Sequence, residues 1–117
     1  MKSADLLRTE DLDVQIVYPD GIERLLNQGI KDLTPWHMMD REHARQKLRG
    51  LRERYVRKYV PFASRQDTDD IACLDPELPG RVFIVHDFAS EGYELRQEFE
   101  SFWDWFRAAI EDMIEFE

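Results

Sequence analysis

Three short stretches decide the fold of this chain: Tyr59-Val-Pro-Phe-Ala63, Asp70-Ile-Ala-Cys-Leu-Asp75 and Arg81-Val-Phe-Ile-Val-His-Asp-Phe88. Successive side chains of a strand point to opposite faces of the sheet, and both faces of the third stretch are largely apolar. Such a pattern is typical of a central strand that is covered on both sides. The turn residues at 75–80, Asp-Pro-Glu-Leu-Pro-Gly, predict an antiparallel hairpin between the second and third stretches.

A further strand is expected after the turn at 90–92. There Tyr93, Leu95 and Phe99 share one face, and charged side chains share the other. This alternation is typical of a half-exposed strand in an antiparallel sheet. The sequence therefore predicts an α+β fold in which helices cover an antiparallel meander of three to five strands.

The residues after Ser101 have the pattern of a closing C-terminal helix. The Ser101 hydroxyl can accept a hydrogen bond from an amide of the first turn, and Asp104 can reach back to complete a capping box. Apolar residues then recur at spacings of three and four, as in a helix that packs on a sheet. They are Phe102, Trp105, Phe106, Ala109, Ile110 and Met113.

The elements upstream of these strands are less regular. Residues 14–18 have the composition of a short edge strand, and residues 22–30 have the spacing of a short helix. We expect a loop or a brief extended segment at 33–39. Trp36 there either plugs the core or lies at the surface, and the core position is favoured, since an exposed tryptophan usually needs a partner. Asp40 is a candidate N-cap for a longer helix that runs to about residue 57.

Composition limits the class of protein. The 117 residues fit one domain, 1–117, and 43% hydrophobic residues suffice for a core. No apolar run approaches the roughly 18 residues of a membrane span, and the N-terminal residues lack the apolar segment of a secretory signal. Cys73 is the single cysteine, which we expect to be buried, so no internal disulfide can form. We therefore expect a soluble protein of the reducing cytoplasm.

The formal net charge of −9 disfavours nucleic acid and favours basic partners. The charge is uneven, because the helix expected after Asp40 is basic and the residues after Asp87 are acidic. One face of that helix carries Arg41, Arg45, Arg49 and Arg52. We expect these arginines to pair with the acidic C-terminal region rather than with phosphates. Gly50 in mid-helix marks a bend or a close approach of another group.

The densest group of carboxylates follows the first of the three stretches and comprises Asp67, Asp69, Asp70 and Asp75. It fails the calcium-loop template, because Ile71 and Ala72 fall where an oxygen ligand and a glycine are needed. A solvated acidic turn is the favoured interpretation. An acidic recognition loop for a basic protein and the metal site of an uncharacterised enzyme are the alternatives. Adjacent His86 and Asp87 point to opposite faces of their strand, which argues against an acid–base pair.

Several motifs are similar to those of one known group of proteins. They are Pro61-Phe-Ala63, the segment from Asp69 to Asp75, the strand from Val82 to Phe88, Ser101-Phe102, Tyr18-Pro19 and Pro35-Trp36. With these motifs the chain resembles the SUKH superfamily, which includes the fungal cell-wall-assembly regulator domain and many bacterial immunity proteins. The resemblance implies an α+β domain, and the bacterial members are implicated in neutralising polymorphic toxins by binding them. It brings no catalytic residues with it.

We therefore expect a non-enzymatic protein-binding domain, an immunity protein that neutralises a cognate toxin by direct binding, without a cofactor or a metal. The alternative is a regulatory adaptor in cell-envelope or signalling assembly. The expected partner is another protein, such as a basic toxin domain, and neither nucleic acid nor a membrane. The residues expected to contact it are Asp67, Asp69, Asp70, Glu91, Glu94 and Glu98.

Overall fold

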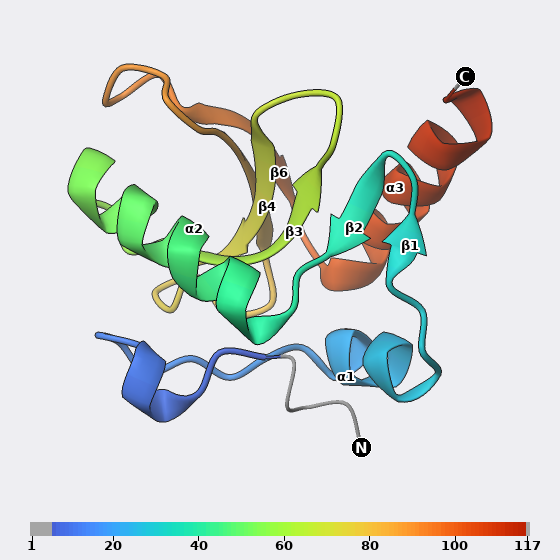
Figure 1. The fold of residues 1–117 in the computed structure, drawn as a ribbon, viewed down its shortest axis with the longest axis horizontal. Helices are drawn as coiled ribbons and strands as arrows, with labels where there is room; N and C mark the ends of the chain where they lie inside the picture. The colour runs from blue at the N-terminus through green and yellow to red at the C-terminus, as the bar shows by residue number, and fades with distance from the viewer. Residues whose placement is uncertain (1–5, 117) are drawn as a thin grey trace.

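A computed structural model of the chain describes residues 6–116, in which six strands form one antiparallel sheet (Figure 1). Each strand pairs with the strands next to it in the chain, which confirms the expected meander. The strands are β1 (Asp32–Leu33), β2 (Trp36–Met38), β3 (Val60–Arg65), β4 (Asp70–Leu74), β5 (Val82–His86) and β6 (Leu95–Phe99). The α-helices of this part of the chain are α1 (Asp20–Asn27), α2 (Arg41–Arg54) and α3 (Phe102–Glu115).

The sheet has one strand more than the expected maximum of five, because residues 32–38 form the β1–β2 hairpin, the extended alternative for this segment. β2 pairs with β3, so that Trp36 lies opposite Arg65. Two- and three-residue strands are too short for periodicity to reveal them. The Trp36 side chain is nonetheless in the core, as expected: it is 3% exposed, its ring meets Trp105 edge to face at 5.6 Å, and its Nε1 donates to Asp112 at 3.0 Å.

In the interior of the sheet, β4 and β5 form a hairpin whose register sets Asp70 opposite His86 at one end. Four of the five β5 residues are buried, as the apolar pattern on both faces predicts. Cys73 in β4 is fully buried, and burial raises the pKa of its thiol. The predicted hairpin and the predicted burial of Cys73 are both confirmed.

The closing helix α3 packs against β1, β2 and β6 and against α1. The Ser101 hydroxyl accepts from the Asp104 amide at 3.2 Å, which confirms this cap, whereas the Asp104 carboxylate accepts from Arg107 and does not complete the predicted capping box. Trp105 is 1% exposed and meets Phe62 of β3 edge to face at 5.1 Å. The buried stripe fades toward the end of the helix, where Met113 is 37% exposed. The aromatic residues in the first turns of α3 therefore make most of the contact between this helix and the core.

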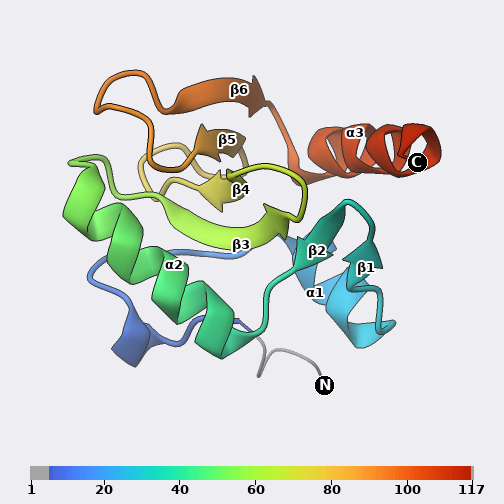
Figure 2. The same ribbon diagram turned by 45° about the horizontal axis from the view of Figure 1, so that its top comes forward.

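Helix α2 lies on β3 (Figure 2) and begins where predicted, because the Asp40 side chain accepts from the His43 amide at 2.8 Å. It ends at Arg54, three residues before the predicted end near residue 57. Tyr55 is extended there and 3% exposed, since the chain turns to bury this ring and enter β3. A Cβ at Gly50 would lie 2.4 Å from Nη2 of Arg54. The predicted close approach is thus to an arginine of the same helix.

The segment 12–19 is not a strand, so the prediction of an edge strand at 14–18 was wrong. Val17 is 87% exposed, and this segment has no partner in the sheet. It runs along one side of the molecule between the short 3₁₀ turn Thr9–Asp11 and α1 (Figure 1). The predicted short helix is confirmed as α1. Within residues 6–116, no helix combines the length and apolarity that crossing a bilayer requires.

Candidate protein-binding surface

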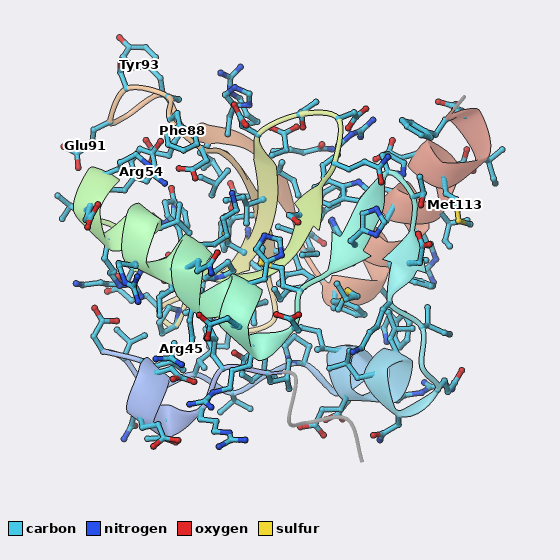
Figure 3. The ribbon with its side chains drawn as sticks, viewed as in Figure 1. Arg45, Arg54, Phe88, Glu91, Tyr93 and Met113 are labelled. Carbon is cyan, nitrogen blue, oxygen red and sulfur yellow. The ribbon has the colours of Figure 1, made fainter. Side chains whose placement is uncertain are left out.

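Two aromatic side chains of the β5–β6 loop, residues 87–94, stand in solvent. Phe88 is 65% exposed and Tyr93 is 77% exposed, and Figure 3 shows both at the same end of the molecule as Glu91. Val56, which is 80% exposed and follows α2, is joined to the loop because its amide donates to Glu91 Oε2 at 3.0 Å. Exposed aromatic rings are the side chains that most often dominate protein contacts, so this loop is the candidate site.

The loop begins at a buried ion pair. Asp87 is 1% exposed, and its two carboxylate oxygens accept from Nε and Nη2 of Arg54 at 2.8 and 2.7 Å. The Arg54 guanidinium also lies 4.1 Å from the centroid of the Phe88 ring. One side chain therefore neutralises the carboxylate and supports the exposed ring.

The backbone at Phe88 is strained. Its φ of +67° lies in the left-handed region, which costs energy for a residue other than glycine. The Phe88 amide donates to Oδ1 of Asp87 at 2.9 Å, and the Asp87 amide donates to the carbonyl of Asp69 at 3.0 Å. These contacts hold the strained residue and turn its ring outward.

The far end of the loop is fixed by Glu94. This side chain is 7% exposed; its carboxylate accepts from the Gly92 amide at 2.7 Å and from the Tyr59 hydroxyl at 2.9 Å. Burial raises the pKa of Glu94, but hydrogen bonds from its own amide, Tyr59 and Gly92 outweigh burial and hold that pKa below its ordinary value. Burial and the same hydrogen bond raise the pKa of Tyr59. Between the two anchors, the Tyr55 hydroxyl donates to the Ala89 carbonyl at 2.8 Å.

Glu94 was expected on the binding surface, and its burial removes it from contact with any partner. Strand alternation placed Glu94 outward with Arg96, but its side chain turns inward to satisfy the Gly92 amide. The ring of Tyr93, expected on the core-facing side, takes the exposed position instead.

The acidic turn, residues 67–70, lies beside this loop, because β4 begins at Asp70 and β5 ends at His86. Asp70 Oδ1 is 2.8 Å from Nδ1 of His86. Asp67 pairs with Arg65 at 2.7 Å, and this hydrogen bond is the main reason that the pKa of Asp67 is lowered. Asp67 and Asp69 are exposed. The structure thus brings the acidic turn to the loop that carries Glu91.

Two other carboxylates lie away from this end. Asp75 follows β4 at the opposite end of the sheet, where it is 3% exposed and pairs with Arg57 at 2.7 Å. Glu98 lies opposite Phe83, one residue from the end of β6, and reaches Arg81 at 3.3 Å. The four aspartates therefore do not form one cluster. Within residues 6–116, no three His, Cys, Asp or Glu side chains gather as they would around a metal ion.

The basic face of α2 pairs with the N-terminal segment and not with the acidic C-terminal region, so that expectation was wrong. Arg41 and Arg45 reach Asp11 at 2.8 and 3.4 Å, and Arg52 reaches Asp13 at 2.8 Å. The hydrogen bond from Arg41 is the main cause that holds the pKa of Asp11 at about 2. Sequence distance misled the prediction, because residues 11–13 lie under α2 in the fold.

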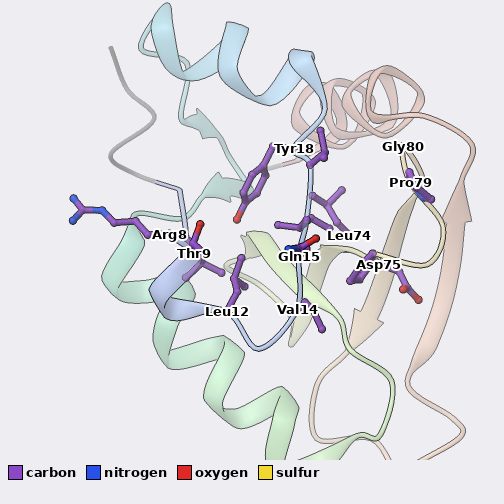
Figure 4. A pocket seen from close by; sticks show the side chains of 14 residues that line it. Arg8, Thr9, Leu12, Val14, Gln15, Tyr18, Leu74, Asp75, Pro79 and Gly80 are labelled. Atoms are coloured by element: carbon purple, nitrogen blue, oxygen red, sulfur yellow. The ribbon is translucent and has the colours of Figure 1, made fainter.

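A groove of about 780 Å³ lies between the N-terminal segment and the β4–β5 turn (Figure 4). Leu12, Val14 and Leu74 contribute to its mostly apolar lining. Two charged residues line it: Arg8 is exposed and lies 3.8 Å from Glu10, and Asp75 is buried and pairs with Arg57 at 2.7 Å. The β5–β6 loop combines two exposed rings with the exposed carboxylate of Glu91, and we take it as the stronger candidate.

Comparison of the chain with protein-family models, curated proteins and solved structures gives no significant match. The resemblance to the SUKH superfamily therefore stays a prediction. The clustering of carboxylates pointed to the acidic residues and not to the aromatic ones, although the composition of residues 87–93, Asp-Phe-Ala-Ser-Glu-Gly-Tyr, indicates exposed rings. A turn composition that includes two aromatic residues, directly after a buried strand, marks rings that the core does not take up.

Proposed function

We propose that this chain is a non-enzymatic protein-binding domain that docks through the β5–β6 loop. The observation that carries the proposal is the solvent exposure of Phe88 and Tyr93 on a loop fixed at both ends. A fixed loop loses little conformational freedom when it binds, so more of the contact energy appears as affinity. Two aromatic rings beside acidic groups suit a partner surface that has an apolar depression rimmed by Lys and Arg.

We further propose that the partner is a toxin domain and that the chain acts as its immunity protein in the cytoplasm. Support for this step comes from the SUKH-like motifs and from the net charge of −9. Opposite charge on the partner speeds encounter and sets specificity more than it raises affinity. The acidic turn beside the loop supplies such charge through Asp67 and Asp69.

The test is binding to toxin domains encoded beside the gene of this chain, measured by calorimetry. Replacing Phe88 and Tyr93 with Ser is expected to weaken binding by roughly 30-fold or more, the size of a hot-spot loss. Val17→Ser is the matched control, because Val17 is 87% exposed and lies in the N-terminal segment. Equal binding by the loop variant and the control would remove the loop from the interface.

The acidic turn is tested separately by reversing Asp67 and Asp69 to Lys. We expect slower association and a weaker dependence on salt, with a smaller change in dissociation rate. Unchanged association would show that the turn takes no part.

A further inference from the structure

The outer edge of β6 is an unpaired strand edge. β6 is the last strand of the sheet, and no strand lies beyond it among residues 6–116. Figure 2 shows this edge facing away from the helices. Four of its five residues, Leu95 to Glu98, are exposed. A free edge presents backbone N–H and C=O groups that another strand can pair with.

The sequence of β6 is complementary to itself. It reads Leu95-Arg96-Gln97-Glu98-Phe99, with Arg and Glu placed symmetrically about Gln97 and apolar residues at both ends. If two copies pair antiparallel about Gln97, Arg96 of each lies opposite Glu98 of the other. Leu95 and Phe99 form no such pair, because the bulge at Arg96 places them on opposite faces of the sheet. Opposite charges that lie directly across from each other stabilise an antiparallel pair.

The charges of this strand are free to make such pairs. Arg96 forms no ion pair with any of residues 6–116, and Glu98 reaches only Arg81, at 3.3 Å with both side chains 44% exposed. An exposed pair of that kind contributes little. Charges and a bulge usually protect an edge strand, and Arg96 is the bulged residue, with no partner on β5. Charges protect an edge strand by repelling like charges on a second strand, however, whereas here Arg96 and Glu98 of two copies would attract each other.

We propose that two copies of this chain associate through β6, as an antiparallel pair centred on Gln97 that continues the sheet from one molecule into the other. The interface is isologous, as in most homodimers. In this pairing the residues before Leu95 of one copy border those after Phe99 of the other. Each β5–β6 loop then lies beside the start of α3 of the second copy. The proposal does not depend on the proposed function.

The test uses charge reversal and the mass in solution, measured by sedimentation equilibrium. The wild-type chain is expected to dimerise. Arg96→Glu sets Glu against Glu98, and Glu98→Arg sets Arg against Arg96, so each variant alone is expected to dimerise at least roughly tenfold more weakly. The two variants mixed restore every opposite pair and are expected to form a heterodimer, and the double variant is expected to dimerise with itself.

Arg107→Glu and Glu111→Arg on α3 are the matched controls, since Arg107 is 77% exposed and Glu111 is also exposed. They change the net charge equally and are expected to leave dimerisation unchanged, alone or mixed. A wild-type chain that stays monomeric at about 1 mM, or a mixture that fails to associate while circular dichroism shows both variants folded, overturns the proposal. Amide exchange of the wild-type chain gives an independent reading: protection at 95–99 should rise with concentration, and concentration-independent protection counts against the pairing.

Discussion

Removing Arg54 is expected to destabilise the fold more than neutralising its partner does. Arg54→Ala leaves the Asp87 carboxylate, 1% exposed, buried without a counter-charge, whereas Asp87→Asn leaves a guanidinium whose side chain is 27% exposed and can be hydrated. Removing the partner of a buried charge costs about 3–5 kcal/mol, because the charge left behind has no compensation. Each charge-assisted hydrogen bond contributes about 1.5–3 kcal/mol, and Arg54 makes two of them with Asp87.

We therefore expect Arg54→Ala to lower the free energy of unfolding by about 3 kcal/mol or more, and Asp87→Asn by about 1.5–3 kcal/mol. Arg54→Lys keeps the charge but loses the two-point contact, so it should fall between the wild type and Arg54→Ala. Against a total stability of about 5–15 kcal/mol, these losses are large enough to measure by urea unfolding followed with tryptophan fluorescence.

Arg45→Ala is the matched control on the same helix (Figure 3), because Arg45 is 43% exposed and its ion pairs are both 3.4 Å long. We expect a loss below about 1 kcal/mol. If Arg54→Ala costs no more than Arg45→Ala, or if Asp87→Asn costs more than Arg54→Ala, the buried pair does not anchor the loop and the reasoning is refuted.

Three further predictions concern the core, α2 and the N-terminal segment. Trp105→Ala should cost about 3–5 kcal/mol, because this ring is 1% exposed among three other aromatic rings; urea unfolding measures the loss, and a cost below that of a surface substitution contradicts the packing. Gly50→Ala should destabilise, although alanine favours a helix by about 1 kcal/mol, because its Cβ would push the Arg54 guanidinium off its two hydrogen bonds with Asp87; a gain in the unfolding midpoint counts against this geometry. The hydrogen bond from Arg52 is the main cause that lowers the pKa of Asp13 from 3.8 to about 2. The stability that this ion pair contributes is therefore complete above pH 3.8, falls as the pH drops toward 2, and is absent in Asp13→Asn, whose stability should change less between pH 4 and 2. If urea unfolding shows the same change of stability with pH in the wild type and in Asp13→Asn, the ion pair makes no such contribution.

The sheet could be predicted from the sequence because its signals are local. Apolar alternation in residues 82–88 and the two prolines after Asp75 fix the β4–β5 hairpin without reference to the rest of the chain. The Asp40 and Ser101 caps likewise act within one turn of their helices. Each of these predictions depends on residues that are close in sequence, and each is confirmed by the structure.

The site could be predicted only in part, because its anchors are distant in sequence. The partner of Arg54 lies 33 residues away in Asp87, and that of Tyr59 lies 35 residues away in Glu94. Alternation assigned Glu94 to the exposed face, whereas an amide of the neighbouring turn draws it inward. The ion pairs of the α2 arginines were mispredicted for the same reason, because no periodic pattern in the sequence identifies their partners at 11–13.

The β5–β6 loop separates the residues that shape it from those that face outward. Arg54, Asp87 and Glu94 hold the backbone, while the side chains of Ser90 and Tyr93 are exposed and form no hydrogen bond or ion pair with any of residues 6–116. Random substitution at 90 and 93 can therefore change what the surface recognises while the scaffold stays intact. Natural selection against a changing partner, or a library of variants made at these two positions, could therefore change binding specificity without loss of stability.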